Sequence, residues 1–197
     1  MPEELFSDPN KPLHLDIGSA RGQFLIELSE IDQDWNLLGL EIRNALVISA
    51  NRDVRRRRLE NVQFLFCNAN ISLQTWLSCL QVGILQRVSI QFPDPWFKRR
   101  HHKRRVLQKP LLLSIAMAMS PGAELFVQSD FHGVIQPMVE LIEETSLFNT
   151  HLKNDQIWLE KNPYLISTER EKYVVKKKLF VYRALYYRNH NIVSAIN

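Results

Sequence analysis

The chain contains 197 residues, of which 45% are hydrophobic and 23% are charged, and its net charge is +4. This size and composition predict a single globular domain with a full hydrophobic core, and its two cysteines exclude a disulfide framework. No stretch approaches about 18 consecutive apolar residues and the first 15 residues hold no signal-peptide core, so we expect a cytoplasmic protein without a membrane partner.

Short apolar runs alternate with longer segments of helical spacing, which predicts an α/β domain with a mostly parallel sheet. Strands are expected at 13–17, 37–41, 62–67, 88–92 and 124–128, and helices at about 24–28, 44–58, 71–80, 107–119 and 134–144. Pro121-Gly122 is expected to stop the helix before it. Residues 1–11 are expected to be flexible, and residues 12–197 to form one domain.

The C-terminal part departs from this alternation. Thr168 is a candidate N-cap, and Glu171 lies three residues later, the spacing of a capping box. A long aromatic strand is expected at 179–187 with no helix after it. Such a final strand can join a parallel sheet in the antiparallel direction.

Polar side chains stand at the ends of five successive predicted strands: Asp16, Glu41, Asn68, Asp94 and Asp130. Any one of them is also a good turn former. In open parallel sheets, however, ligands bind beyond the carboxyl ends of the strands. The series therefore predicts a ligand site at this edge of the sheet.

The loop from Gly18 to Gly22 indicates the class of cofactor. Ala20 stands where a dinucleotide fingerprint requires its middle glycine, so a nucleotide-like cofactor without a pyrophosphate fits better. Glu41 is placed to accept hydrogen bonds from two ribose hydroxyls, and Asn68 can both donate to and accept from an adenine edge. S-adenosyl-L-methionine meets these conditions.

Residues 91–105 carry the strongest functional signal in the chain. Asp94 lies between two prolines and beside Trp96, and six of the nine residues at 97–105 are Lys or Arg. An acidic-aromatic loop next to dense positive charge predicts an enzyme that acts on nucleic acid, with Lys103, Arg104 and Arg105 among the phosphate-binding residues. Trp96 fits base stacking and a core anchor equally well. His101 and His102 lack partners at metal-ligand spacing, so no metal is expected.

This segment also resembles a known family. Phe92-Pro-Asp-Pro-Trp-Phe-Lys98 followed by residues 100–105 is similar to the signature of the tRNA (guanine-N7)-methyltransferase family, and 39–43, 128–130 and 168–171 extend the likeness. Asp16 and Asn68 stand where the family commonly has Glu and Asp, and both replacements keep an acceptor.

The resemblance implies a Rossmann-like class I methyltransferase with a mostly parallel seven-stranded sheet, helices on both faces and an antiparallel final strand. It implies methyl transfer from S-adenosylmethionine to N7 of guanine-46 in tRNA. Cofactor contacts would be Asp16, Gly18, Glu41, Asn68 and Asp94, with Asp94 also catalytic. Substrate contacts would include Lys98, Asp130, Thr168 and Glu171.

Two other functions remain open on the sequence, namely methylation of another nucleic-acid base and RNA binding without catalysis. The dense basic run after Trp96 and the segment at 168–171 favour tRNA (guanine-N7) methylation over both alternatives. The sequence does not distinguish a monomer from a homodimer.

Overall fold

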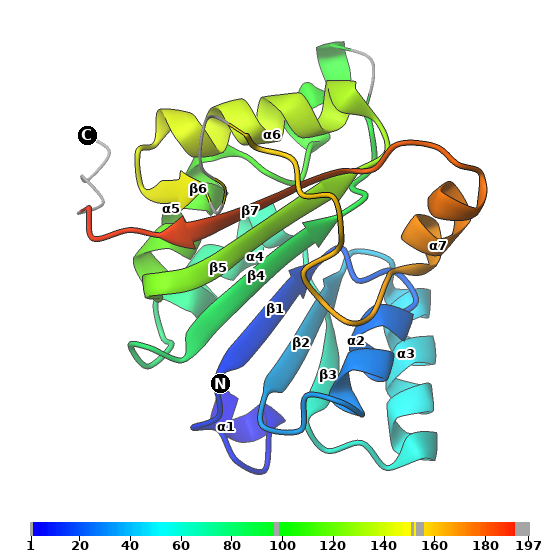
Figure 1. The fold of residues 1–197 in the computed structure, drawn as a ribbon. Helices are drawn as coiled ribbons and strands as arrows, with labels where there is room; N and C mark the ends of the chain where they lie inside the picture. Colours follow the sequence, from blue (N-terminus) through cyan, green and yellow to red (C-terminus); the bar gives the residue numbers. More distant parts are fainter. Residues whose placement is uncertain (1, 97–98, 151, 153–155, 192–197) are drawn as a thin grey trace.

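A computed structural model describes residues 2–96, 99–150, 152 and 156–191. Its centre is one seven-stranded sheet in the order β3-β2-β1-β4-β5-β7-β6 (Figure 1). The strands are β1 Leu13–Ile17, β2 Asn36–Glu41, β3 Val62–Phe66, β4 Leu85–Gln91, β5 Met119–Ser129, β6 Phe148–Thr150 and β7 Tyr182–Arg188. Strands β1 to β5 pair in parallel, and β7 pairs antiparallel with both β5 and β6. The predicted mixed sheet with an antiparallel final strand is confirmed.

Helices cover both faces of the sheet, as predicted (Figure 1). The helices are α1 Pro2–Leu5, α2 Gln23–Ser29, α3 Asn44–Arg57, α4 Ala69–Leu77, α5 Lys109–Ala118, α6 His132–Glu144 and α7 Glu169–Lys176, with a 3₁₀ helix η1 at Arg99–Arg104. One buried cluster joins α4, α5 and α6 to the sheet, and a second joins α2 and α3 to it. None of the helices in the described part of the chain combines the length and apolarity that a membrane crossing requires.

On the face of the sheet that α2 and α3 cover, the segment before α7 takes the place of a further helix. Tyr164 is buried there, with its ring 5.2 Å from His14, 5.3 Å from Phe126 and 5.9 Å from Phe24. Leu159 ties the same segment to β7 through a hydrogen bond to the carbonyl of Arg183. The chain thus crosses the sheet face and delivers α7 to the carboxyl ends of the strands (Figure 1).

The observed elements differ from the sequence prediction at several points. Pro121-Gly122 does not stop α5, which already ends at Ala118, but lies inside β5, where the register shifts between Leu85↔Met119 and Arg87↔Glu124. The turn-forming residues serve a bulge, with Gly122 at φ 90°. The short strand β6 was not among the expected segments.

The N-terminal residues expected to be flexible are partly anchored. Phe6 is 6% exposed within the larger core cluster. The side chain of Asn36 donates a hydrogen bond to the carbonyl of Asp8, at 2.8 Å. The beginning of β2 therefore holds this part of the segment.

The strand order fixes where a ligand can enter. From β1 the chain first builds outward through β2 and β3, and then returns to place β4 on the other side of β1. Connections leave β1 and β4 in opposite directions, which opens a crevice beyond their carboxyl ends.

Candidate functional site

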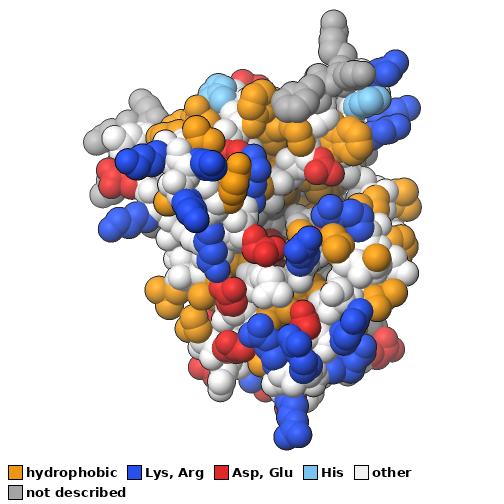
Figure 2. Space-filling view, turned by 90° about the vertical axis from the view of Figure 1, so that its right-hand side faces the viewer, with side chains coloured by type: hydrophobic (Ala, Val, Ile, Leu, Met, Phe, Trp, Pro, Cys, Tyr) orange, Lys and Arg blue, Asp and Glu red, His pale blue; other side chains and the backbone are white. Residues whose placement is uncertain are grey.

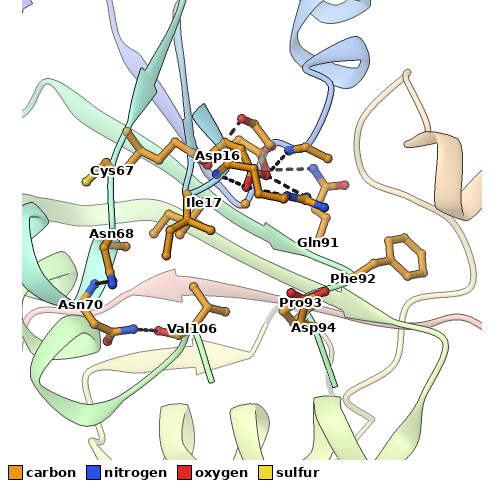
Figure 3. A pocket seen from close by; sticks show the side chains of 18 of the residues that line it. Asp16, Ile17, Cys67, Asn68, Asn70, Gln91, Phe92, Pro93, Asp94 and Val106 are labelled. Atoms are coloured by element: carbon orange, nitrogen blue, oxygen red, sulfur yellow. Dashed lines mark hydrogen bonds and ion pairs between the residues drawn. The ribbon is translucent and has the colours of Figure 1, made fainter. Parts of the chain in front are cut away.

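A cavity of about 750 Å³ occupies this crevice (Figure 3). Five residues predicted at strand ends or in the glycine loop line it, namely Asp16, Gly18, Glu41, Asn68 and Asp94. Trp96, Lys103, Arg104 and Thr168, predicted on the substrate side, line it as well. Asp130, Arg105 and Glu171 are not among its lining residues, and Lys98 lies outside the described part of the chain.

The glycine loop is shaped by close packing behind it. Gly22 has φ 76° and begins α2, and a Cβ there would lie 2.6 Å from the ring of Phe64. A Cβ on Gly39 would lie 2.4 Å from the same ring. Only glycine allows these approaches, so the two glycines let the loop and β2 close around Phe64 beneath the cavity.

Asp16 forms the buried acidic wall of the cavity. It lies near the end of β1, as the sequence predicted, and is 4% exposed. Its Oδ1 accepts hydrogen bonds from Ser89 Oγ (2.5 Å) and from Gln91 Nε2 (3.2 Å). Asp16 and Gln91 are labelled in Figure 3. Burial, with a smaller contribution from the charge of Glu41, raises the pKa of Asp16 to about 6 against the effect of these bonds. A cationic ligand group beside it would favour its ionised form and lower this pKa.

Glu41 is the second buried carboxylate, at the end of β2. Its Oε1 accepts from the backbone N–H and from Nε of Arg43, both at 2.9 Å. Its Oε2 accepts from the backbone N–H of Ala20 and from Nη2 of Arg43, both at 3.0 Å. Burial by itself would raise the pKa of Glu41, but these hydrogen bonds together hold it below its usual value. The carboxylate therefore faces the cavity in its charged form.

Asn68 and Asn70 link the cofactor side to the basic loop. Asn68 caps α4 by accepting from the backbone N–H of Asn70, at 3.2 Å. The side chain of Asn70 donates to the carbonyls of Arg105 (3.4 Å) and Val106 (3.0 Å). The start of α4 thus holds the end of the basic segment over the cavity (Figure 3).

Asp94 and Trp96 lie in the loop that follows β4. Asp94 is exposed, and Trp96 is half-buried and belongs to neither core cluster. The indole meets His101 edge-on at 5.7 Å, and the guanidinium of Arg104 lies 5.1 Å from its centre. Phe92 and Trp96 have φ of 49° and 35°, left-handed conformations that side chains rarely adopt. The geometry favours a ligand-facing indole over the core anchor that the sequence also allowed.

The remaining predicted substrate residues lie around and behind this opening. Asp130 forms an ion pair with Arg170, at 2.5 Å, and Arg170 lines the cavity. Thr168 caps α7 by accepting from the backbone N–H of Glu171, as predicted. Figure 2 shows Lys and Arg side chains on several sides of a hollow on this face of the molecule.

The side chain of Glu171 has a different set of partners from that of a capping box. It is buried beside Arg183, with Nη2 2.8 Å from its Oε1. Its Oε2 accepts from Asn162 at 2.6 Å and from Gln128 at 3.3 Å. The substrate contact assigned to Glu171 by resemblance stays a prediction.

Sequence reasoning missed several polar residues that complete the site. Gln91 donates to Asp16 and accepts from Gln128, at 2.7 Å, so the two glutamines join the cavity wall to Glu171. Arg43, which the sequence offers only as part of the 39–43 motif, donates two side-chain hydrogen bonds to Glu41. Both glutamines lie within strands that are otherwise apolar. A polar residue in a buried strand needs a hydrogen-bond partner, and this requirement was the signal in the sequence that could have identified them.

The cavity fits S-adenosylmethionine. It combines two buried carboxylates, a close backbone approach at Gly18 and the aliphatic side chains of Ile42 and Ile71, which are 58% and 76% exposed although they line a cavity. Aliphatic groups left open in this way can cover an adenine ring. The cavity thus offers carboxylates, an amide and aliphatic surface, the groups that an amine, a ribose and a base would require.

The fold is that of known methyltransferases. The crystal structure of the aminoglycoside resistance methyltransferase NpmB1 superposes with a TM-score of 0.62 at 16% identity, covering 94% of this chain and 91% of that one. The sheet order, and a cavity at the carboxyl ends of its strands, are those of the class I methyltransferase fold.

Sequence relatives narrow the class. A family model described as "Putative methyltransferase" matches residues 10–184. A tRNA (guanine-N(7)-)-methyltransferase of Prochlorococcus marinus (strain MIT 9313) is 54% identical over 188 residues, 95% of this chain and 80% of the relative. One of Synechococcus sp. (strain CC9311) is 51% identical over 195 residues, 99% of this chain and 82% of the relative. The chain belongs to the tRNA (guanine-N7)-methyltransferase family.

Proposed function

We propose that this protein transfers the methyl group of S-adenosylmethionine to N7 of guanine-46 in tRNA, in the cytoplasm. One observation carries the proposal: a single cavity holds the buried carboxylates of a cofactor half beside Asp94, Trp96 and the basic residues of a substrate half. The basic residues of the substrate half would serve no purpose in an enzyme whose substrate was not an anion.

The cofactor half is assigned by chemical match. Asp16 accepts from the amine of the methionine part, and Glu41 accepts from the ribose hydroxyls. Gly18 allows the backbone to approach the cofactor closely, and Asn68 contacts the adenine edge. When bound, S-adenosylmethionine supplies a sulfonium methyl group as the electrophile. The neighbouring carboxylates favour this positive ligand without reacting with it.

The substrate half has to orient a base rather than deprotonate it. Guanine N7 carries an in-plane lone pair, so the reaction depends on holding N7 within about 3 Å of the methyl group and in line with it. The N1–H and N2–H₂ edge of guanine offers two parallel donors, and the carboxylate of Asp94 is an acceptor of matching geometry. Trp96 offers a face for stacking, worth about 1–3 kcal/mol.

The basic residues bring the polyanion to this opening. Lys103 and Arg104 line the cavity, and Gln108 fixes their loop by donating to the carbonyls of Lys103 (2.8 Å) and Arg105 (3.0 Å). Phosphate contacts of this kind position a nucleic acid without reading its sequence. We assign Lys103, Arg104 and Arg105 to the tRNA backbone, and Lys98, Asp130, Thr168 and Glu171 to the substrate side.

The direct test uses unmodified tRNA and methyl-labelled S-adenosylmethionine. The label is expected in tRNA at a site that chemical cleavage at N7-methylguanine locates to position 46. A tRNA with adenine at that position is the matched control and is expected to stay unlabelled. Label on an adenine or on an exocyclic amine would point to the alternative base methyltransferase, and tRNA binding without label would point to a non-catalytic binding module.

A further inference from the structure

The carboxylate of Glu41 has no acceptor capacity left for a ribose. A carboxylate offers about four lone-pair positions. Backbone N–H groups of Ala20 and Arg43 take two of them, and Nε and Nη2 of Arg43 take the other two. Two ribose hydroxyls can therefore bind Glu41 only if two of these four donors leave.

The four donors differ in their freedom to leave. The two N–H groups belong to the backbone that forms the cavity wall. The guanidinium stands at the end of a flexible stem, and its side chain is 60% exposed, whereas that of Glu41 is 3% exposed. Moving an exposed guanidinium into water costs little compared with rebuilding a loop. Arg43 is thus the donor that yields.

The displaced guanidinium remains at the mouth of the cavity. Arg43 lines the same cavity as Asp94, Lys103 and Arg104. The pKa of Arg43 is raised chiefly by its hydrogen bonds to Glu41 and, to a smaller extent, by the negative charges of Glu41 and Asp94. A released cation at this place adds to the positive charge that meets an approaching phosphate.

We propose that the ribose of S-adenosylmethionine displaces the Arg43 side chain from Glu41, and that the freed guanidinium then holds a tRNA phosphate. This inference rests on the proposed function for its second half. Arg43 would act as a positioning residue that exchanges one anionic partner for another. Cofactor binding would thereby strengthen tRNA binding, and the reverse coupling must be equal in size.

Binding of the non-reacting product S-adenosylhomocysteine tests the first half. In Arg43→Ala the competitor is gone, so S-adenosylhomocysteine is expected to bind at least about threefold more tightly by calorimetry. Arg43→Lys keeps the charge without the two-pronged contact and should show part of this gain. Arg55→Ala removes an exposed arginine near the far end of α3 and is the charge-matched control. Equal or weaker binding in Arg43→Ala would overturn the exchange.

Binding of tRNA with and without S-adenosylhomocysteine tests the second half. In the wild type, S-adenosylhomocysteine is expected to tighten tRNA binding about threefold or more and to steepen the dependence of log Kd on log salt by about 0.7–0.9, one phosphate contact. In Arg43→Ala both effects should vanish. Their persistence would overturn the phosphate contact. If the protein did not act on tRNA at all, wild-type protein would not bind tRNA in either state, and the calorimetric result would still stand; if it bound tRNA without methylating it, the labelling experiment alone would fail.

Discussion

Asp16→Asn should stabilise the ligand-free protein while weakening its cofactor site. Asp16 is 4% exposed, and burial raises its pKa from 3.8 to about 6. The carboxyl therefore binds its proton more tightly in the native state than in the unfolded state. Its contribution to stability is lost as the pH rises from the lower of these two pKa values to the higher. The gap between 3.8 and about 6 corresponds to about 3 kcal/mol at neutral pH.

The substitution isolates this contribution because it keeps the local contacts. The carbonyl oxygen of asparagine can still accept from Ser89 and Gln91, as Oδ1 of Asp16 does. His14 acts in the opposite direction: burial, and secondarily the charge of Arg87, lower its pKa to about 3, so its contribution to stability rises between about pH 3 and 6.5. The wild-type profile combines both effects, and only the difference between the two proteins reports Asp16.

Urea unfolding between about pH 4 and pH 7.5, without cofactor, provides the measurement. The variant is expected to match the wild type near pH 4 and to exceed it by up to about 3 kcal/mol near pH 7.5. S-adenosylhomocysteine should bind the variant at least about tenfold more weakly, because an amide cannot balance the ligand amine. Asp34→Asn, at an exposed carboxylate, is the control and should differ by less than about 0.5 kcal/mol at every pH. A difference that does not grow with pH would refute the reasoning from burial.

Three further predictions concern the substrate half and its support. Asp94→Asn should lower turnover at least about 100-fold with little change in tRNA binding, and a normal rate on bound tRNA would remove Asp94 from the reaction. Replacing residues 103–105 with Gln should raise the tRNA KM and reduce the salt dependence of log Kd by about 2, while turnover at saturating tRNA holds; an unchanged slope would show that they touch no phosphate. Arg183→Met should cost about 3–5 kcal/mol in urea unfolding because Glu171 is left buried without its cation, and adding Glu171→Leu should recover part of that loss.

The sequence predicts the core elements well because their apolar spacing records burial directly. It also brings Glu41, Asn68 and Asp94 to one edge, since the carboxyl ends of parallel strands meet there. The bulge at 121–122 was misread as a helix stop because the same residue types suit both. Strand β6 has three residues, too few to show a period. The hydrogen-bond partners of polar side chains are harder to predict, because the sequence of one strand does not show which strand will lie beside it.

The two halves of the site are held by different kinds of contact. Asp16 accepts from Gln91, Gln91 accepts from Gln128, and Gln128 donates to Glu171, so consecutive buried hydrogen bonds run from the cofactor wall to helix α7. These four side chains are buried, and loss of one would leave its neighbour without that partner in a medium of low dielectric. The Arg43 side chain is exposed and is held by the carboxylate of Glu41, which the ligand would also bind. We therefore expect adjustment to ligands to come from the exposed cation at the mouth, while the buried network keeps the cofactor wall and α7 in fixed relation.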